Sequence, residues 1–441
     1  MIVMKFGGSS VASAERIRHV AGIIKAYRSE MPVVVLSAMG DTTDFLLEAG
    51  ENALKGVVTA AKIEDLHKTT IDELGILGAE AAALLGELKT LLTGISMVRE
   101  LSKKTRDYLV SFGERLSVRI MAEFLTKTGT EAQFVDAWDA GFVSDSSFMS
   151  AELLEETWQN IPKAFSRYDQ NLIPVVTGFI AKDTKGVITT LGRGGSDLTA
   201  TMLGSALHAQ EVQTWKDVDG ILSADPRIVK EPLSLPEITY EEATELAYFG
   251  AQVLHPRSML PCIKTGTLVR VKNSYNIDSA GSLIVQTLSG VSPLVRAITS
   301  VKGVTLIDVV STRMLGASGF LAHIFNQFLK WNISIDVIAT SEVSVSLTVN
   351  TDVSELHGLL EDLRHVAEVN TQEKKAIIAI VCDVKHSSKI LADAFSALDS
   401  HGINVQMLSQ GASKVNISML CQETEANDVV RILHKRFFGT D

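Results

Sequence analysis

The sequence predicts an α/β protein in which a mostly parallel central sheet, between two layers of helices, is followed by two smaller α+β domains. Two observations predict this fold. Short apolar, β-branched runs alternate with helical periodicity and glycine-rich turns up to about residue 285, and the remaining chain contains an internal repeat. Alternating strands and helices favour a parallel sheet covered on both faces. Self-similarity at a fixed period indicates duplicated units.

The composition excludes several classes of protein. The chain has 441 residues, of which 46% are hydrophobic and 21% charged, with a net charge of −11. It lacks the basic footprint of nucleic-acid binders, an apolar run of the ~18 residues that span a bilayer, and a secretory signal. Its three cysteines show neither disulfide nor metal-ligand spacing. We therefore expect a cytoplasmic protein without nucleic-acid, membrane or protein-bound metal partners.

The first region begins with strand–turn–helix units. Residues 2–6 form a short β-type run that a Gly-Gly turn and an amphipathic helix follow. Residues 32–38, 171–178 and 187–191 are apolar, β-branched runs typical of strands buried on both faces. Residues 45–105 show few strand signals and are predicted to be helical. Ligands of such sheets bind in the turns at the carboxyl ends of the strands.

The C-terminal region superposes on itself after a shift of 70 positions, which places Phe325 on Phe395. Each copy reads helix, strand, small polar turn, strand, helix. The first copy can begin with a strand at 304–310, whereas the second begins at 376–381 and ends on a helix, without a closing strand. We expect the unused run 295–301 to supply that strand, so that the first unit is inserted within the second. The predicted domains are residues 1–285, residues 303–372, and residues 294–302 together with 373–441.

The first candidate motif, at residues 5–10 (KFGGSS), closes the first strand and opens a helix. Glycines let the backbone approach a phosphate, and a helix N-terminus offers unpaired N–H groups and a positive dipole end. Lys5 could reach a transferring phosphoryl group. Because the lysine precedes the glycines, this is neither a Walker loop nor a dinucleotide fingerprint. An ordinary tight turn is the alternative interpretation.

The second candidate motif, at residues 191–199 (LGRGGSDLT), again joins a strand to a helix. Arg193 offers a planar fork that suits a carboxylate or a phosphate. The alternative is that Ser196 or Asp197 merely caps the helix. One arginine among three glycines is unusual for a plain loop, so we favour a binding role.

Three further segments are less specific by themselves. Lys216 and Arg227 could face nucleotide phosphates, although Asp-Gly and Asp-Pro turns explain the same stretch. Its Asp-x-Asp-Gly sequence lacks the rest of a calcium loop. Glu114 is a lone carboxylate beside a glycine. His255, between a leucine and a proline and without a visible partner, is interpreted as structural.

Taken in order over essentially the whole chain, these motifs resemble those of the aspartate kinases of the amino-acid kinase family. The repeat resembles paired ACT domains, which have a ferredoxin-like fold. The pair is similar to that of the monofunctional, lysine-sensitive type of aspartate kinase. WKDVDG and FGAQ resemble plant-type members, but without a transit peptide we expect a bacterial source. The matching segments are KFGGSSVA at 5–12, SFGERLS at 111–117, TLGRGGSDLTA at 190–200, WKDVDGILSADPR at 215–227, FGAQVLHP at 249–256, MLGASGFLAHIF at 314–325 and SEVSVSLTV at 341–349.

The resemblance implies phosphoryl transfer from ATP, with Mg²⁺ bridging its phosphates, to the β-carboxylate of L-aspartate. The product, 4-phospho-L-aspartate, starts the pathway to lysine, threonine, methionine and diaminopimelate. The implied catalytic residues are Lys5, which stabilises charge on the phosphoryl group, and Asp197. Glu114 would pair with the α-ammonium and Arg193 with the α-carboxylate. A β-carboxylate is already ionised at pH 7, so no general base is needed. The implied aspartate site comprises Thr43, Glu114, Arg193, Ser196 and Asp197.

The resemblance also implies a nucleotide site, which comprises Lys5, Gly7, Gly8, Ser9, Lys216, Asp217, Leu222, Arg227 and Gln252. Many bacterial members have lysine at the position of Gln252 and tyrosine at that of Leu222. Because Gln252 lacks a positive charge, we hypothesise that Lys216 replaces the missing cation.

The ACT pair implies a pocket for a regulatory amino acid, which we expect to be L-lysine. The alternative is that Met314, Phe320 and Leu321 are simply core residues. Effector sites of this family form where ACT domains of two subunits pair, so a homodimer is implied, and larger oligomers remain open. The implied effector pocket comprises Met314, Ala317, Ser318, Gly319, Phe320, Leu321, Asp336, Thr340, Ser341 and Glu342.

Two other functions share parts of this pattern. A sibling kinase acting on glutamate, acetylglutamate, carbamate or a nucleotide would share the fold and the glycine-rich turns. The WKDVDG and SFGE segments together with two ACT units favour aspartate. A pure amino-acid sensor with a dead kinase domain is the other alternative, and the intact Lys5, Arg193 and Asp197 argue against it.

Overall fold

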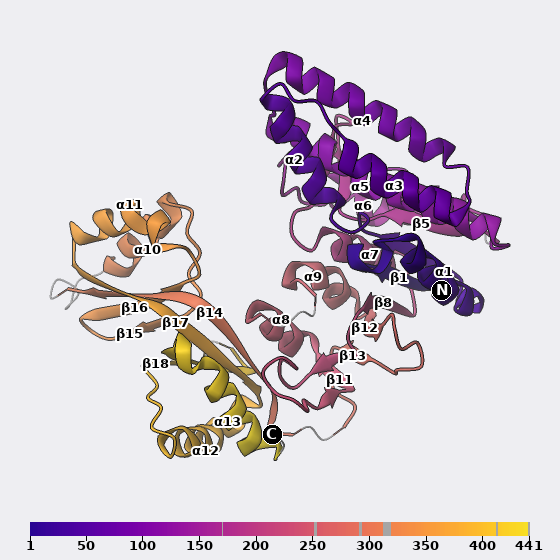
Figure 1. The fold of residues 1–441 in the computed structure, drawn as a ribbon. Helices are drawn as coiled ribbons and strands as arrows, with labels where there is room; N and C mark the ends of the chain where they lie inside the picture. The colour runs from indigo at the N-terminus through magenta and orange to yellow at the C-terminus, as the bar shows by residue number, and fades with distance from the viewer. Residues whose placement is uncertain (170, 251–253, 291–292, 312–318, 412, 440–441) are drawn as a thin grey trace. The chain divides into compact units, whose positions relative to one another are not determined.

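The computed structural model describes residues 1–169, 171–250, 254–290, 293–311, 319–411 and 413–439. Contacts within the chain divide it into two compact units (Figure 1). They group residues 222–235 and 241–253, which lie inside the range predicted for the first domain, with the C-terminal part of the chain. The first unit comprises Met1–Ile221, Pro236–Tyr240 and Leu254–Thr287, and the second comprises Leu222–Leu235, Glu241–Val253 and Leu288–Asp441.

An eight-stranded sheet, counted over the described residues, forms the centre of the first unit, with the order β11-β13-β12-β8-β1-β2-β5-β3. Neighbouring strands are parallel except β12 and β13. β1, β2 and β5 are buried along their whole length, as expected of strands covered on both faces. The strands are β1 (Ile2–Phe6), β2 (Pro32–Leu36), β3 (Ala132–Val135), β5 (Ile173–Thr177), β8 (Glu211–Lys216), β11 (Glu237–Thr239), β12 (Leu268–Asn273) and β13 (Ser282–Val285).

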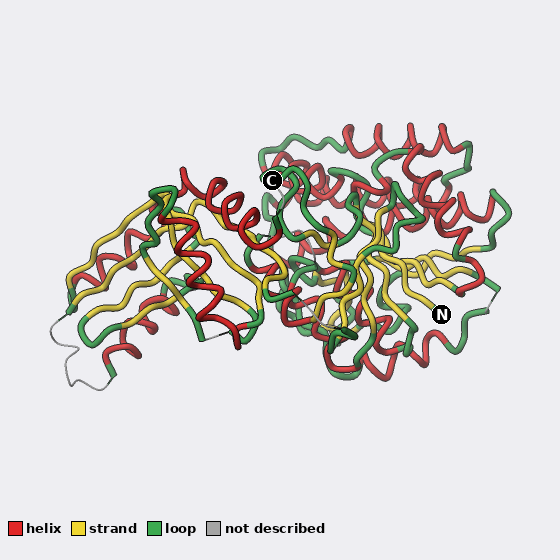
Figure 2. Tube along the Cα trace, turned by 90° about the horizontal axis from the view of Figure 1, so that it is seen from below, coloured by secondary structure: helices red, strands yellow, loops and turns green. Residues whose placement is uncertain are grey.

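Helices lie on both sides of this sheet, which confirms the predicted three-layer arrangement (Figure 2). The predicted helical stretch 45–105 is confirmed by α2, α3, α4 and the start of α5. A small three-stranded sheet of β4 (Val143–Ser144), β6 (Ile180–Asp183) and β7 (Ile188–Thr190) leads into α7. The helices are α1 (Ala14–Ala26), α2 (Thr42–Leu54), α3 (Ala61–Leu74), α4 (Ala79–Val98), α5 (Lys103–Lys127), α6 (Thr157–Phe165), α7 (Gly195–Ala206) and α9 (Pro256–Thr265).

Helix α4 has the length and the hydropathy of a membrane-crossing helix, by composition alone. This differs from the expectation that no segment would pass such a test. Leu84, Leu88 and Leu92 of α4 belong to the apolar core of the first unit, and α4 packs against α2 and α5. Its apolar residues are therefore explained in part by burial within the helical layer.

The second unit contains a six-stranded sheet, again counted over the described residues, with the order β15-β16-β14-β17-β19-β18. Its strands are β14 (Val295–Val310), β15 (Ile338–Thr340), β16 (Ser344–Val349), β17 (Glu368–Cys382), β18 (Met407–Ser409) and β19 (Asn416–Gln422). Two short strands, β9 (Ile221–Leu222) and β10 (Ser234–Leu235), pair with each other. The helices are α8 (Tyr240–Tyr248), α10 (Phe320–Lys330), α11 (Val353–Arg364), α12 (Ser387–Asp399) and α13 (Ala426–Phe438).

Two long strands are shared by the two repeat copies. β14 and β17 pair antiparallel, and the register shifts between Lys302 and Val304. The first half of β14 pairs with the half of β17 that lies beside β19, and its second half lies beside β16. The run 295–301 therefore closes the second copy, which confirms the prediction that the first α+β unit is inserted within the second.

Alternating side chains of the shared strands enter different apolar clusters. Ile378 and Ile380 pack in a cluster with residues of α12 and α13. Ile377 and Ala379, which alternate with them along β17, join another cluster that contains Phe249, the residue directly after α8. A helix from the middle of the chain is therefore anchored to the sheet that the repeat forms.

Candidate active site

Parallel pairing brings four strand ends to one edge of the central sheet. β8, β1, β2 and β5 are neighbours in that order, and each adjacent pair is parallel. Their carboxyl ends therefore lie along the same edge, where ligands of α/β sheets bind. Lys5 is near the end of β1, Lys216 ends β8, and Gly178 follows β5.

The turn after β1 needs glycine at one position because it approaches a neighbouring loop. A Cβ at Gly8 would lie 2.7 Å from the carbonyl oxygen of Ala38, which is too close for any side chain. Gly40 N donates a hydrogen bond of 3.0 Å to Gly8 O across the same contact. Gly7 and Ser9 flank this position, and Ser9 is exposed. The turns after β1 and β2 therefore pack backbone against backbone at the sheet edge.

Lys5 and Asp197 form an ion pair that joins the two glycine-rich motifs. Lys5 Nζ lies 2.7 Å from Asp197 Oδ1, and the side chains are only 11% and 13% exposed. The N-cap position of α7 is Gly194, which makes no side-chain cap. Asp197 lies in the first turn of α7 and directs its carboxylate to Lys5, so the interpretation of Asp197 as a mere cap is wrong.

Lys216 lies within electrostatic reach of this pair. Burial lowers the pKa of Lys216, the charge of Asp197 raises it, and the charge of Lys5 lowers it further. Asp217 is exposed beside it. Two lysines at adjacent strand ends therefore concentrate positive charge in a protein whose net charge is −11.

The loop after β8 is organised by an acidic residue that the sequence analysis did not single out. Asp219 Oδ1 accepts hydrogen bonds from Asn273 Nδ2 at 3.0 Å and from Asn276 Nδ2 at 3.1 Å. This contact joins the loops that follow β8 and β12. The Asp-Gly turn at Asp219 was the available signal, but its amide partners are distant in the sequence.

Glu114 is a buried carboxylate with an unused oxygen. It follows Gly113 on α5, where a Cβ would lie 2.6 Å from that of Ala38. This close approach lets Ala38 N donate a hydrogen bond of 3.1 Å to Glu114 Oε1. Its Oε2 is buried without a hydrogen-bond partner among the described residues. Burial raises the pKa of Glu114 to about 8, although hydrogen bonds from backbone N–H groups oppose that shift. Such a group would be stabilised by a cationic ligand.

The second glycine-rich turn holds an exposed Arg193 between two left-handed glycines. Gly192 has φ of 71° and Gly194 has φ of 70°. A Cβ at Gly194 would lie 2.5 Å from that of His255, so glycine is required there for two reasons. His255 caps α9 by accepting a hydrogen bond of 3.3 Å from Arg257 N, which agrees with its interpretation as structural.

The two predicted hydroxyl groups lie on the first turns of helices. Ser196 lies against the end of β5, where a Cβ at Gly178 would be 2.6 Å from that of Ser196. Thr43 is half-buried in the first turn of α2, which follows the loop that contacts Gly8. The structure thus places both residues on elements that begin at the sheet edge.

Three predicted nucleotide-site residues are not brought to this edge by any described contact. Gln252 lies outside the described residues. Leu222 and Arg227 belong to the second compact unit. Arg227 is 79% exposed at its side chain and pairs with Asp225 at 2.6 Å, within its own turn.

The predicted effector residues are only partly described. Met314, Ala317 and Ser318 lie outside the described residues. Phe320 packs against the core of α10 and α11, as the alternative interpretation proposed, whereas Leu321 is 38% exposed. The remaining members are Gly319 at the N-cap of α10, Asp336 before β15, Thr340 at the end of β15, and Ser341 and Glu342 in the β15–β16 turn.

Asp336 has a partner that the sequence analysis missed. Tyr248, the last residue of α8, donates a hydrogen bond of 3.1 Å from its hydroxyl to Asp336 Oδ1. Burial raises the pKa of Asp336, and its Oδ2 is buried without a partner among the described residues. The residues are far apart in the sequence, so no local pattern could have joined them.

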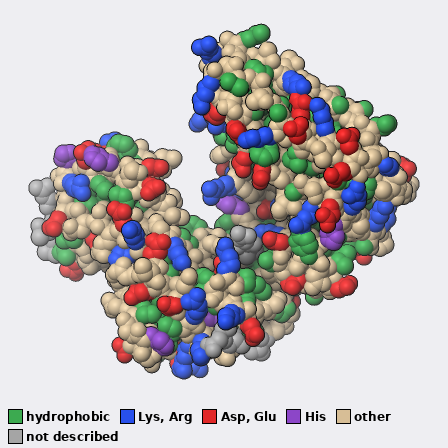
Figure 3. All heavy atoms as spheres, viewed as in Figure 1, with side chains coloured by type: hydrophobic (Ala, Val, Ile, Leu, Met, Phe, Trp, Pro, Cys, Tyr) green, Lys and Arg blue, Asp and Glu red, His purple; other side chains and the backbone are tan. Residues whose placement is uncertain are grey.

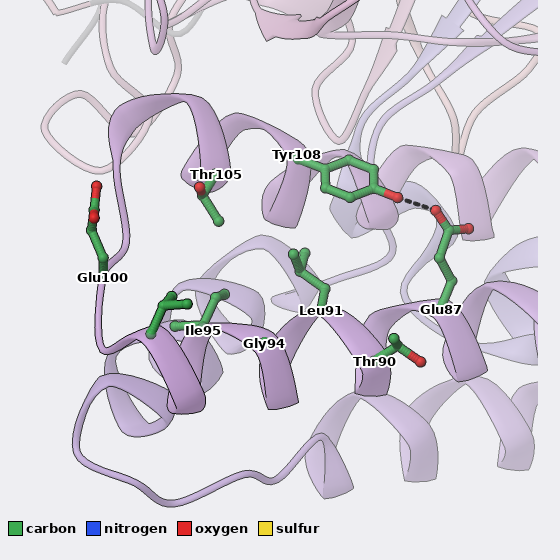
Figure 4. A pocket seen from close by; sticks show the side chains of 9 residues that line it. Glu87, Thr90, Leu91, Gly94, Ile95, Glu100, Thr105 and Tyr108 are labelled. Atoms are coloured by element: carbon green, nitrogen blue, oxygen red, sulfur yellow. Dashed lines mark hydrogen bonds between the residues drawn. The ribbon is translucent and has the colours of Figure 1, made fainter.

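A cavity of about 520 Å³ lies elsewhere in the first unit, between α4 and α5 (Figure 4). Tyr108 donates a hydrogen bond to Glu87 at its wall. None of the predicted site residues that the structure describes lines this cavity. On the face shown in Figure 3, acidic and basic side chains are interspersed over the surface.

Comparison with known proteins defines the class of the chain. The model of the amino acid kinase family matches residues 1–273, and a model of the ACT domain matches residues 378–437. The structure of E. coli aspartokinase III in complex with aspartate and ADP (R-state) covers 99% of this chain and 100% of its own, with a TM-score of 0.83 and 31% identity. The lysine and aspartate complex of the same enzyme (T-state) has a TM-score of 0.80 and 31% identity, with 99% of each chain covered.

A curated relative is closer in sequence. Chloroplastic aspartokinase 1 of Arabidopsis thaliana is 49% identical over 456 residues, which cover 99% of this chain and 80% of the relative. The chain belongs to the aspartokinase family, whose members are kinases that phosphorylate aspartate. This confirms the predicted family, the fold class and the kinase activity.

Proposed function

We propose that this chain transfers the γ-phosphoryl group of Mg-ATP to the β-carboxylate of L-aspartate, with substrate held between Glu114 and Arg193. The observation that carries the proposal is the unpaired oxygen of Glu114, buried at the sheet edge. An α-ammonium beside it would satisfy the carboxylate, and Arg193 can bind the α-carboxylate through two parallel hydrogen bonds. Both ends of the amino acid are then held, and the β-carboxylate remains free to react.

Lys5 and Lys216 are proposed to receive the phosphates. Asp197 holds Lys5 through the 2.7 Å ion pair, which fixes the ammonium group at the end of β1. Mg²⁺ enters with ATP as part of the substrate. The β-carboxylate is an ionised nucleophile at pH 7, so catalysis requires positioning and charge stabilisation rather than proton abstraction. Lys216 supplies the second positive charge and replaces the cation absent at position 252.

Regulation by L-lysine and a homodimeric state are part of the same proposal. The E. coli aspartokinase III structure with lysine and aspartate supports lysine as the effector. The half-paired carboxylate of Asp336 offers an acceptor for an effector ammonium. β15 lies at an edge of the six-stranded sheet, with exposed Ile338 on it and exposed Val343 in the turn that follows it, which supports pairing with a second copy. Three free, buried cysteines support a cytoplasmic location.

The direct test is coupled ADP release from purified protein with Mg-ATP and L-aspartate, with and without millimolar L-lysine. Turnover that lysine suppresses is the expected result. Turnover that is indifferent to lysine would remove the regulatory part and make threonine the next effector to test. Turnover with glutamate or N-acetylglutamate but not with aspartate would contradict the proposed substrate.

The role of Glu114 has its own test. Glu114→Gln keeps the shape of the side chain but removes the charge that would pair with an ammonium. Its KM for aspartate should rise about tenfold or more, since a charge-assisted hydrogen bond is lost. Its KM for ATP should stay within about twofold. An unchanged KM for aspartate would contradict the assignment.

A further inference from the structure

Two charged side chains outside the predicted site hold the backbone at the base of the Arg193 turn. Asp107, fully buried on α5, accepts hydrogen bonds from Thr190 N at 3.0 Å and from Thr190 Oγ1 at 2.8 Å. Arg257, in the first turn of α9, donates a hydrogen bond of 3.2 Å to Leu191 O. Thr190 ends β7 and Leu191 directly precedes the turn, so two different helices hold the same short segment.

The same two side chains hold the segment that faces the turn. Asp107 accepts from Met149 N at 3.0 and 3.1 Å, one contact for each carboxylate oxygen. Arg257 donates a hydrogen bond of 2.8 Å to Ala151 O. This segment lies against the turn, because a Cβ at Gly192 would be 3.4 Å from Met149 O. Asp107 and Arg257 therefore hold the Arg193 turn and residues 149–151 together, and we call these two segments with their two charged side chains the turn frame.

The turn frame holds the backbone of Met149 in an uncommon conformation. Met149 has φ of 77°, a left-handed value that is uncommon for a residue with a side chain. Such a conformation persists only where the surroundings hold it in place. Burial raises the pKa of Asp107, and the hydrogen bonds from Met149 and Thr190 oppose that shift. Among the described residues, the hydrogen bonds that stabilise the Asp107 carboxylate therefore all come from residues of the turn frame.

Asp107 also connects the Arg193 turn to Glu114. Both acidic residues lie on α5, seven positions or about two helical turns apart, and so project from a similar side of the helix. α5 carries Glu114 itself and, through Asp107, the base of the turn that presents Arg193. The two groups proposed to bind the ends of the amino acid thereby share one rigid support.

We propose that Asp107 and Arg257 are positioning residues that set the separation between Glu114 and Arg193, and with it the productive binding of aspartate. Neither residue touches substrate in this proposal. It rests on the proposed roles of Glu114 and Arg193 in holding the two ends of L-aspartate.

The first experiment compares Asp107→Asn with a matched control, Asp183→Asn. Asp183 is 5% exposed and accepts hydrogen bonds from Lys185 N, Val187 N and Ser146 Oγ at the far end of the β6–β7 hairpin. Asp107→Asn should lower kcat/KM for aspartate about tenfold to a hundredfold, because a small misplacement of a binding group has effects of that size. The KM for ATP should change less than about twofold, and Asp183→Asn should leave both near the wild-type values. Equal losses in the two variants would overturn the proposal.

A double-mutant cycle separates positioning from general damage to the fold. Arg193→Ala should lower kcat/KM for aspartate strongly, and Asp107→Asn should then add less than about twofold, since both changes remove the same interaction. The same loss in both backgrounds would overturn the positioning role while leaving Arg193 in the site. If Arg193→Ala has no effect, the proposed role of Arg193 fails and this inference fails with it. Should Asp107→Asn not fold, Arg257→Gln, at a 29% exposed side chain, enters the same cycle with the same expected outcome.

Discussion

The two glycine-rich turns of the first unit look alike in sequence but need glycine for different reasons. In the turn after β1, Gly8 has no left-handed backbone and is required because its backbone touches the carbonyl of Ala38. In the turn before α7, Gly192 and Gly194 adopt φ near 70°, which side-chain-bearing residues rarely adopt. The first turn therefore needs glycine because two backbone segments come close together, and the second needs glycine because its backbone is left-handed. The Lys5–Asp197 ion pair joins them, so neither turn is an independent site.

The largest effect is expected where the two turns meet. Lys5→Met removes the cation at the end of β1 and leaves Asp197 without its partner. The kcat should fall about a hundredfold or more, because one preorganised group that stabilises transition-state charge has effects of that size. Initial rates at saturating Mg-ATP and aspartate measure this. A kcat within tenfold of wild type would show that the ion pair is structural only.

We expect kcat/KM for aspartate to depend on pH more strongly than kcat/KM for ATP. The pKa of free Glu114 is raised to about 8, and only its ionised form can pair with an ammonium. Below that pH, kcat/KM for aspartate should rise about tenfold per pH unit, whereas kcat/KM for ATP at saturating aspartate should stay flatter. Glu114→Gln should remove this slope. A slope that remains in the variant would assign it to another group.

The same shift predicts a stability effect of Glu114 with a definite sign. The pKa is higher in the folded protein than its ordinary value of 4.5, so the native state binds more protons than the unfolded state between these pH values. The contribution of Glu114 to the free energy of unfolding is present below pH 4.5 and is lost as pH rises towards about 8. Urea unfolding of the wild type and of Glu114→Gln across this range should show a smaller decline in the variant.

A pair of adjacent substitutions isolates the close approach in the first turn. Gly8→Ala places a Cβ 2.7 Å from Ala38 O and should destabilise the fold by about 1–3 kcal/mol. Gly7→Ala is the control, because Gly7 has φ of −77° and the nearest atom to its added Cβ is Lys5 Nζ at 3.9 Å. Thermal or urea unfolding compares the two. Similar losses of stability would mean that the turn requires glycine at both positions.

The smallest expected effect concerns the second lysine. Lys216→Ala should raise the KM for ATP about three- to tenfold, since one of two phosphate-facing charges is lost. The KM for aspartate should change little. An ATP KM and a kcat that both stay intact would contradict the replacement of the cation absent at position 252.

Much of the architecture could be predicted because its causes are local or periodic. The buried strands at 32–36 and 173–177 are continuous apolar runs, as strands covered on both faces require. The insertion of one α+β unit in the other followed from a repeat that lacked a closing strand, and β14 supplies it. No local or periodic pattern predicted that α8 is anchored to the six-stranded sheet. Its contacts with residues of β14 and β19 join distant parts of the chain.

The features of the candidate site can likewise be separated into those with local causes and those that depend on contacts between distant segments. The sequence alone determined the two turns, the lysine before one of them, the arginine within the other and the family to which they belong. These are properties of short segments, in which residue type and spacing dictate backbone and charge. Only the tertiary structure decided that Asp197 holds Lys5, that Glu114 keeps one oxygen unpaired, and that Asp107 and Arg257 hold the base of the Arg193 turn. Burial and contacts between distant segments exist only once the chain has packed.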